Sequence, residues 1–210
     1  ELSQGGLANR VENSCAPASG FTYLGENLEF TYTLTAKNSV GDTTENYIDP
    51  FHKFSGDDGE TPFAGEVHTV GAINDPNNIA ASLSDRVTIE ALERSSGWES
   101  GTAAFTVRLN VARKDIPDGP FDDVRFGIYV KDGDGVEITA PDLDIDGDSV
   151  AESTQAASAT RLRYGRISLE NAHGSELLPL NMPFYAEYFD GNTFITNDLD
   201  SCTTFTLSDF

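Results

Sequence analysis

The chain has 210 residues, and its 35 acidic residues against 13 basic ones give a formal net charge of −22. This length allows one good hydrophobic core or two small ones. The negative charge repels nucleic acid and anionic membranes, so neither is an expected partner, and it attracts divalent cations. No apolar run approaches the ~20 residues that a membrane-spanning helix needs, so no membrane insertion is expected in this segment.

Residues 1–14 are polar and contain one Gly-Gly pair. This composition predicts a linker or a loosely attached edge segment, which could be donated as a strand to a neighbouring copy. The chain begins at Glu1 and shows no positively charged leader before an apolar stretch. These features indicate a processed product or a fragment, with any export signal lying elsewhere.

From Phe21 onward, apolar residues recur at every second position in several runs. The clearest runs are 28–36, 105–111 and 124–130, and turns rich in Pro, Gly and Asp separate them. A period of two residues is that of a strand with one buried face. Residues 77–94 fit helical spacing at first and strand spacing later, so we expect a loop or one helical turn up to Ser84 and a strand beyond it.

These patterns predict an all-β fold, an antiparallel β-sandwich of Ig-like or jelly-roll-like type, over residues 15–210. Two packed sandwiches that divide near residues 95–101 are the alternative. Toward the C-terminus we expect one strand from Leu162 to Leu169, a second over 184–189 and, after an Asp-Gly turn, a third over 193–196.

The C-terminal segment also carries the most specific resemblance to a known family. Its motifs are Arg163-Tyr-Gly-Arg166, Leu169-Glu-Asn-Ala172 and Gly174-Ser-Glu-Leu-Leu178. Further upstream stand Gly20-Phe-Thr-Tyr-Leu-Gly-Glu26 and Pro117-Asp-Gly-Pro-Phe121, so the motifs run in the expected order from Cys15 onward. The chain thereby resembles the C-terminal region of MshQ-type proteins, which are linked to biogenesis of the mannose-sensitive haemagglutinin type IV pilus.

The resemblance implies a surface-exposed or secreted protein of a Gram-negative bacterium, associated with pilus assembly or adhesion. It brings no catalytic residues with it. We therefore expect a non-enzymatic extracellular module for structure or adhesion, whose partners are other surface or pilus proteins, or copies of itself in an extracellular fibre. A calcium-dependent carbohydrate-binding module, with glycans as partners, is the competing hypothesis, and a secreted hydrolase is the third.

Cys15 and Cys202 are the only cysteines. From the residues alone, they form either one disulfide or two buried free thiols. The resemblance implies the bridge, because cysteines of that family occur at both places. Such a bridge would close nearly the whole chain and stabilise it by about 5 kcal/mol on the loop-entropy estimate. It would also require an oxidising compartment, hence the periplasm or the cell exterior.

One short loop concentrates carboxylates at alternate positions, followed by one more downstream: Asp142, Asp144, Asp146, Asp148 and Glu152. Calcium prefers roughly six to eight hard oxygen ligands, and this spacing, with a glycine at the bend, allows one loop to wrap an ion. Glu152 stands at the eleventh position and no amphipathic helices flank the loop, so it is not an EF-hand. The pattern predicts a calcium site, and a solvated acidic loop is the alternative.

The remaining candidates are weaker. Trp98 stands in a turn-like context and is either a core residue or, if exposed, a platform for a sugar ring. Asp132-Gly-Asp134-Gly is better explained as a hairpin turn than as further metal ligands. His52, His68 and His173 lack metal-ligand spacing and are expected to be structural or surface residues. The usual nucleophile and cofactor motifs are missing, so no enzyme activity is predicted.

Overall fold

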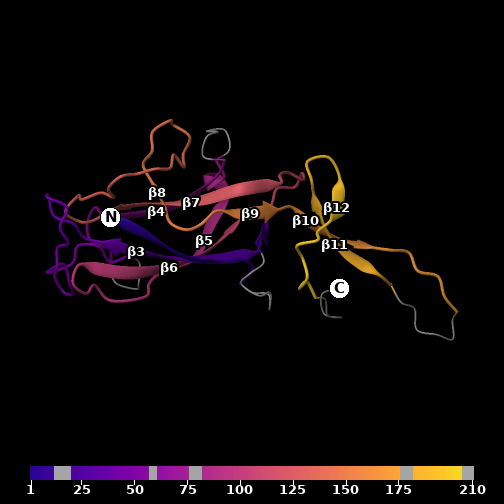
Figure 1. Ribbon diagram of the computed structural model, residues 1–210, viewed down its shortest axis with the longest axis horizontal. Helices are drawn as coiled ribbons and strands as arrows, with labels where there is room; N and C mark the ends of the chain where they lie inside the picture. Colours follow the sequence, from indigo (N-terminus) through magenta and orange to yellow (C-terminus); the bar gives the residue numbers. More distant parts are fainter. Residues whose placement is uncertain (12–19, 57–60, 76–81, 176–181, 205–210) are drawn as a thin grey trace.

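The computed structural model describes residues 1–11, 20–56, 61–75, 82–175 and 182–204, and nearly all of its regular structure is β-strand. The strands form three sheets (Figure 1). Two sheets face each other and enclose the main core, and the third projects from one end of this sandwich. The predicted all-β, largely antiparallel β-sandwich is confirmed.

The sandwich consists of a four-stranded sheet and a facing five-stranded sheet. The first has the order β1 (Leu2–Ala8), β3 (Asn27–Thr35), β6 (Thr102–Val111) and β5 (Val87–Arg94), all antiparallel. The second has the order β2 (Thr22–Tyr23), β9 (Thr160–Arg163), β7 (Phe121–Lys131) and β4 (Val67–Asn74), with β8 (Thr154–Gln155) also pairing with β7. β2 and β9 are parallel, and a 3-10 turn, η2 (Ser84–Arg86), precedes β5.

The third sheet is a small antiparallel one. Its strands follow the order β10 (Gly165–Leu169), β11 (Phe184–Phe189) and β12 (Phe194–Thr196). None of the helical structure in the described residues has the length and hydrophobicity that a membrane-spanning helix requires.

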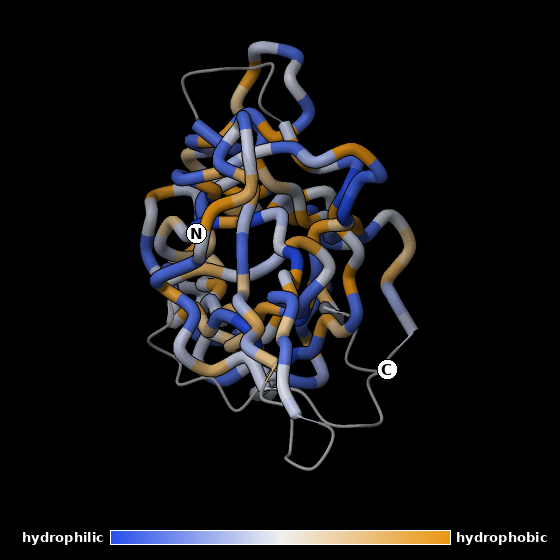
Figure 2. Tube along the Cα trace, turned by 90° about the vertical axis from the view of Figure 1, so that its right-hand side faces the viewer, coloured by the Kyte–Doolittle hydropathy of each residue, from blue (hydrophilic) through white to orange (hydrophobic). Residues whose placement is uncertain are grey.

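The main core is made by the inward-facing residues of the alternating runs. Phe30 on β3, Phe105 on β6 and Phe126 on β7 are fully buried. The rings of Phe30 and Phe126 stack across the two sheets with 5.5 Å between their centroids. Burial of one such side chain contributes roughly 1.5–3 kcal/mol. Buried and more exposed residues alternate along β3 and β6, which confirms the two-residue period expected for these strands, and Figure 2 shows hydrophobic and hydrophilic segments interspersed along the trace.

The N-terminal segment is part of the sandwich. β1 is the edge strand beside β3, in a register that pairs Leu2 with Leu34 and Ala8 with Glu29. Of the two alternatives for residues 1–14, a linker or an edge segment, residues 2–8 form the edge segment, and they pair as an edge strand within their own chain. Leu2 and Leu7 pack against the core, and this apolar contact holds the otherwise polar strand in place.

Residues 95–101, the alternative domain boundary, connect β5 to β6. These strands are hydrogen-bonded neighbours, with Val87 opposite Val111 and Arg94 opposite Phe105. A domain boundary does not separate adjacent strands of one sheet, so a division into two sandwiches at this place is wrong.

The strand expected from Leu162 to Leu169 is divided between two sheets. β9 ends before Tyr164 and β10 begins after it. The Tyr164 carbonyl accepts a hydrogen bond from the Phe189 N–H at 3.0 Å, so the chain changes its pairing partner here from β7 to β11. Gly165 lies against Tyr23, and a Cβ at this position would come within 2.4 Å of the ring. A residue without a side chain is therefore needed where the chain leaves the sandwich.

Arg10 joins the third sheet region to the sandwich. Its buried guanidinium donates to Glu26 at 2.8 Å and to Asp200 at 2.9 Å. Tyr23, whose ring lies 4.9 Å from the guanidinium, donates its hydroxyl to Asp200 at 2.9 Å. Burial alone would raise the pKa of Asp200, but hydrogen bonds from Thr203 and Arg10 outweigh it and lower this pKa to about 2. Nothing in the sequence pattern indicated an ion pair between residues 190 positions apart.

Candidate metal centre

The acidic loop 142–152 is anchored to the five-stranded sheet by its apolar residues. Leu143 and Ile145 are buried and form a small second hydrophobic cluster with Ile73 of β4. Because side chains alternate along an extended chain, the neighbouring Asp144 and Asp146 point away from this cluster. Burial of the apolar pair thus fixes the direction in which the carboxylates project.

A facing pair of glycines, the glycine notch, makes room for Ile145. Gly71 on β4 and Gly127 on β7 lie opposite each other in the register of the sheet. A Cβ would come within 2.5 Å of Ile145 Cδ1 at Gly71 and within 2.8 Å of its Cγ2 at Gly127. The Ile145 carbonyl also accepts hydrogen bonds from the hydroxyls of Ser82 and Ser84, at 2.7 and 2.6 Å. Packing and hydrogen bonding therefore hold the same residue.

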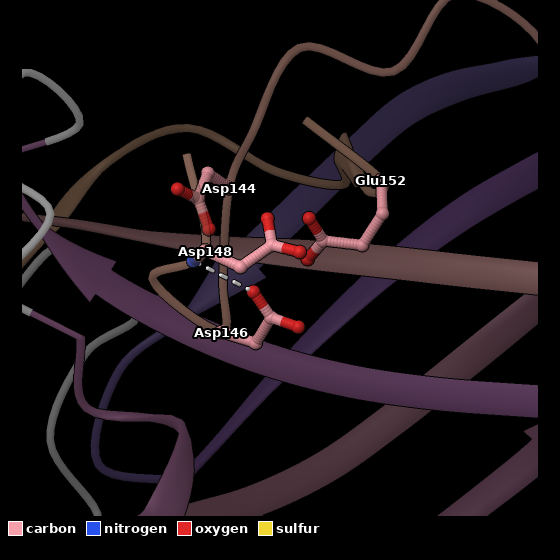
Figure 3. Close-up of side chains that lie close together, drawn as sticks. All are labelled: Asp144, Asp146, Asp148 and Glu152. Atoms are coloured by element: carbon pink, nitrogen blue, oxygen red, sulfur yellow. Dashed lines mark hydrogen bonds between the residues drawn. The ribbon is translucent and has the colours of Figure 1, made fainter. Parts of the chain in front are cut away.

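Four carboxylates converge above this anchor, each offering an oxygen within 4.8 Å of the others (Figure 3): Asp144, Asp146, Asp148 and Glu152. Backbone N–H groups of the loop orient them. Asp144 accepts from Gly147 at 2.7 Å and from Ser149 at 2.8 Å, and Asp146 accepts from the N–H of Asp148 at 3.1 Å. Gly147 and Ser149 adopt left-handed backbone angles, with φ of 84° and 76°, which turn the loop beneath the carboxylates.

Glu152 completes the cluster from the returning chain. Its Oε1 accepts the Ile145 N–H at 3.0 Å, whereas its Oε2 is buried and has no hydrogen-bond partner among the described residues. Burial, together with the like charges of Asp146 and Asp144, raises the pKa of Glu152 above its ordinary value. A buried carboxylate oxygen beside other carboxylates is unfavourable until a cation or a proton neutralises it.

The chemistry of the cluster fits a hard cation. All four side chains are carboxylates, and no histidine or cysteine joins them within the described residues. Zinc and copper sites usually include histidine or cysteine ligands, whereas calcium, magnesium and manganese prefer oxygen. The four acidic residues could therefore hold a metal ion of the oxygen-preferring kind.

Asp142 stands apart from the other four predicted ligands. Its carboxylate accepts the backbone N–H of Gln155 at 2.8 Å, beside the bridge between Leu143 and Ser153. The assignment of Asp142 as a metal ligand is therefore corrected, because this carboxylate closes the base of the loop instead of joining the cluster.

Trp98 is a core residue. Its side chain is 5% exposed, and its Nε1–H donates to the Phe54 carbonyl at 2.9 Å. Stacking on a sugar needs an exposed ring face, so Trp98 is not a ligand contact. Asp132 accepts the N–H groups of Asp134 and Val136, both at 2.9 Å, which confirms the hairpin turn expected there.

Cys202 is not a free thiol. Its expected partner, Cys15, lies outside the described residues, so the pairing of the two stays a prediction. The histidines lie apart from the carboxylate cluster: His52 Nδ1 is 2.7 Å from the Asp49 carboxylate, and His68 shares a hydrogen bond with Tyr32.

A β-sandwich followed by a separate small sheet, with an oxygen-lined cluster on a surface loop, places the chain among multidomain all-β proteins with a candidate cation site. The chain belongs to the DUF6701 family, a family of unknown function. Residues 2–158 match its third domain and residues 163–210 match its fourth. The first match ends at residue 158 and the second begins at residue 163, just before the chain passes from β9 to β10 at Tyr164. No curated protein and no solved structure matches the chain.

Proposed function

We propose that the chain is a non-enzymatic module of a bacterial surface protein, and that calcium stabilises its acidic loop. The convergence of four carboxylates on a loop anchored through Ile145 carries this proposal. Calcium is preferred over magnesium because magnesium keeps several waters and binds through one or two carboxylates, whereas calcium accepts a larger and more flexible set of oxygens. The ion would neutralise the buried Oε2 of Glu152.

The surface location and the role in pilus assembly or adhesion belong to the same proposal. They are supported by the resemblance to MshQ-type proteins. The Cys15–Cys202 bridge is also proposed, with support from the absence of a free thiol at Cys202. Copies of the chain, or other surface proteins, would be its partners. The carbohydrate-binding hypothesis has lost its expected aromatic platform, because Trp98 is buried.

Thermal unfolding with and without calcium tests the metal site. At 10 mM calcium and a Kd of about 0.1–1 mM, binding to the folded chain alone adds roughly 1.4–2.7 kcal/mol. For a domain of this size, the melting temperature is expected to rise by roughly 3–10 °C, and a chelator should reverse the rise.

Two variants make the test specific. Asp144→Asn is expected to remove most of the calcium response, because it neutralises a carboxylate of the cluster. Asp115→Asn neutralises an exposed acidic residue outside the cluster and is expected to keep the full response. The site would be disproved if calcium shifted the melting temperatures of the two variants equally, or if 10 mM calcium did not shift that of the parent chain. The second outcome is decisive because even a Kd of about 1 mM predicts a rise of roughly 3 °C.

A further inference from the structure

A groove of about 840 Å³ lies between the sandwich and the third sheet. The turn that leads from β2 into β3, Tyr23–Glu26, forms one wall, and Gly165–Ile167 of β10 form the opposite wall. Ligand sites occur preferentially at such junctions between domains, in clefts of about 300–1,000 Å³. The groove is separate from the carboxylate cluster and has no part in the function proposed above.

The groove contains an exposed, positively charged side chain, although the net charge of the chain is −22. Arg113 lines it and is exposed, with its guanidinium stacked on the ring of Tyr164 at 4.0 Å. Arg10 and Arg166, which also line the groove, are each paired with a carboxylate. Within the described part of the chain, Arg113 makes no salt bridge. Stacking on Tyr164 holds the planar guanidinium of Arg113 in place, and its N–H groups remain available to donate hydrogen bonds to an anionic group of a ligand.

The opposite wall combines an open strand edge with an apolar face. β10 is the outermost strand of its sheet and pairs only with β11 among the described strands. Three consecutive residues of β10 line the groove, and a strand presents consecutive residues along its edge. Ile167 shares one face of the sheet with Leu169 and Ile195, and these side chains are 42%, 52% and 38% exposed.

We propose that this groove binds an extended acidic peptide segment of another protein, added as a strand to the edge of β10. The outer backbone groups of β10 would pair with the peptide backbone, which is the main source of affinity in strand addition. An Asp or Glu of the peptide would accept hydrogen bonds from Arg113, and its alternate apolar side chains would cover Ile167. A glycan would leave the series of backbone donors and acceptors along β10 unmatched.

Selection from a displayed library of random octapeptides on the immobilised full chain tests the proposal. Enriched peptides are expected to alternate apolar residues and to contain a carboxylate. Arg113→Gln is expected to weaken binding of the best synthetic peptide about tenfold or more, because a charge-assisted hydrogen bond is lost. Ile167→Lys is expected to weaken it similarly, because a charge would replace the apolar contact.

Matched controls separate the groove from the rest of the surface. Arg108→Gln removes another arginine, which pairs with Glu29 at 3.1 Å, and Ile89→Lys replaces a 40% exposed isoleucine on β5. Both are expected to bind the peptide like the parent chain. No enrichment over an Arg113→Gln, Ile167→Lys double variant would overturn the proposal. Binding that ignores Arg113, or binding of an arrayed glycan that depends on Arg113, would overturn it as well. Neither result bears on the calcium site, whose readout is the melting temperature.

Discussion

Replacing Arg10 with methionine is expected to destabilise the chain far more than the loss of a surface ion pair. The side chains of Arg10 and Asp200 are 1% and 0% exposed. Methionine would leave the carboxylate of Asp200 buried without its cation. Removing one partner of a buried pair costs roughly 3–5 kcal/mol, whereas breaking an exposed pair such as Arg108–Glu29 costs at most about 1 kcal/mol. Arg108→Met therefore serves as the matched control.

The pKa of Asp200 sets the pH dependence of this effect. The pKa is about 2 in the folded chain, against an ordinary value of 3.8. A carboxyl whose pKa is lowered by folding contributes stability that is complete above its unfolded pKa and is lost as the pH falls through its folded pKa. In Arg10→Met the burial of Asp200 is no longer offset by Arg10, so its pKa rises. The difference between variant and parent should therefore be largest at neutral pH and should shrink toward pH 2.

Urea unfolding followed by the fluorescence of Trp98, the single tryptophan, measures the free energy of unfolding directly. A double variant, Arg10→Met with Asp200→Leu, is expected to recover part of the lost stability, because the fully buried charge of Asp200 is then removed as well, whereas Glu26, the other partner of Arg10, is 27% exposed. The reasoning is refuted by a loss below about 1 kcal/mol at pH 7, a loss that pH does not change, or a double variant as unstable as the sum of its single changes.

Three further predictions follow from buried contacts. Gly127→Ala is expected to lower stability by roughly 1–3 kcal/mol in thermal unfolding, because its Cβ would lie 2.8 Å from Ile145; an unchanged melting temperature would contradict the packing. Trp98→Phe leaves the buried Phe54 carbonyl without its donor and should cost roughly 1–3 kcal/mol in urea unfolding followed by circular dichroism, with a neutral outcome counting against that hydrogen bond. Burial lowers the pKa of His68 to about 4, so the unfolded chain takes up a proton on this side chain at higher pH than the folded chain does. The free energy of unfolding should therefore fall as the pH drops from 6.5 to 4, and His68→Gln should make it depend less on pH. An equal pH dependence in both proteins would exclude His68 as its cause.

The strands were predictable because their signal is local. β3, β6 and β7 follow runs of alternating residues, and each run contains its own evidence of a buried face. In the ambiguous stretch before Arg94 the expected strand is confirmed from Val87, whereas the 3-10 turn, Ser84–Arg86, begins where a helical turn was expected to end; residues 76–81 lie outside the described residues. Side-chain period and turn residues decide such elements without reference to the rest of the chain.

Pairing between distant segments was not predictable in the same way. The step at Tyr164 changes neither the alternation nor the composition, yet it moves the chain from one sheet to another. The pair of Arg10 and Asp200 depends on how the third sheet docks. A pattern of neighbouring residues contains no information on such contacts until the register of the sheets is known.

The acidic loop could be predicted from the sequence in part. Its composition predicted a carboxylate cluster, and four of the five named residues converge. The alternate spacing gives no reason to assign different roles to Asp142 and Asp144. Their roles differ because the bridge between Leu143 and Ser153 places Asp142 at the base of the loop, away from the cluster. No local sequence pattern marks Arg113, since its stacking on Tyr164 depends on the tertiary structure.

The glycine notch has a consequence for any attempt to transplant the acidic loop. Ile145 is seated in empty space left by Gly71 and Gly127, two residues that contribute no chemical group of their own. The same eleven residues, 142–152, grafted onto a sheet with ordinary side chains at these two positions would clash at Ile145, and the loop would lose this anchor. Transfer of the loop to another protein therefore requires glycines at two facing positions of that protein's sheet, in addition to the metal-ligating residues.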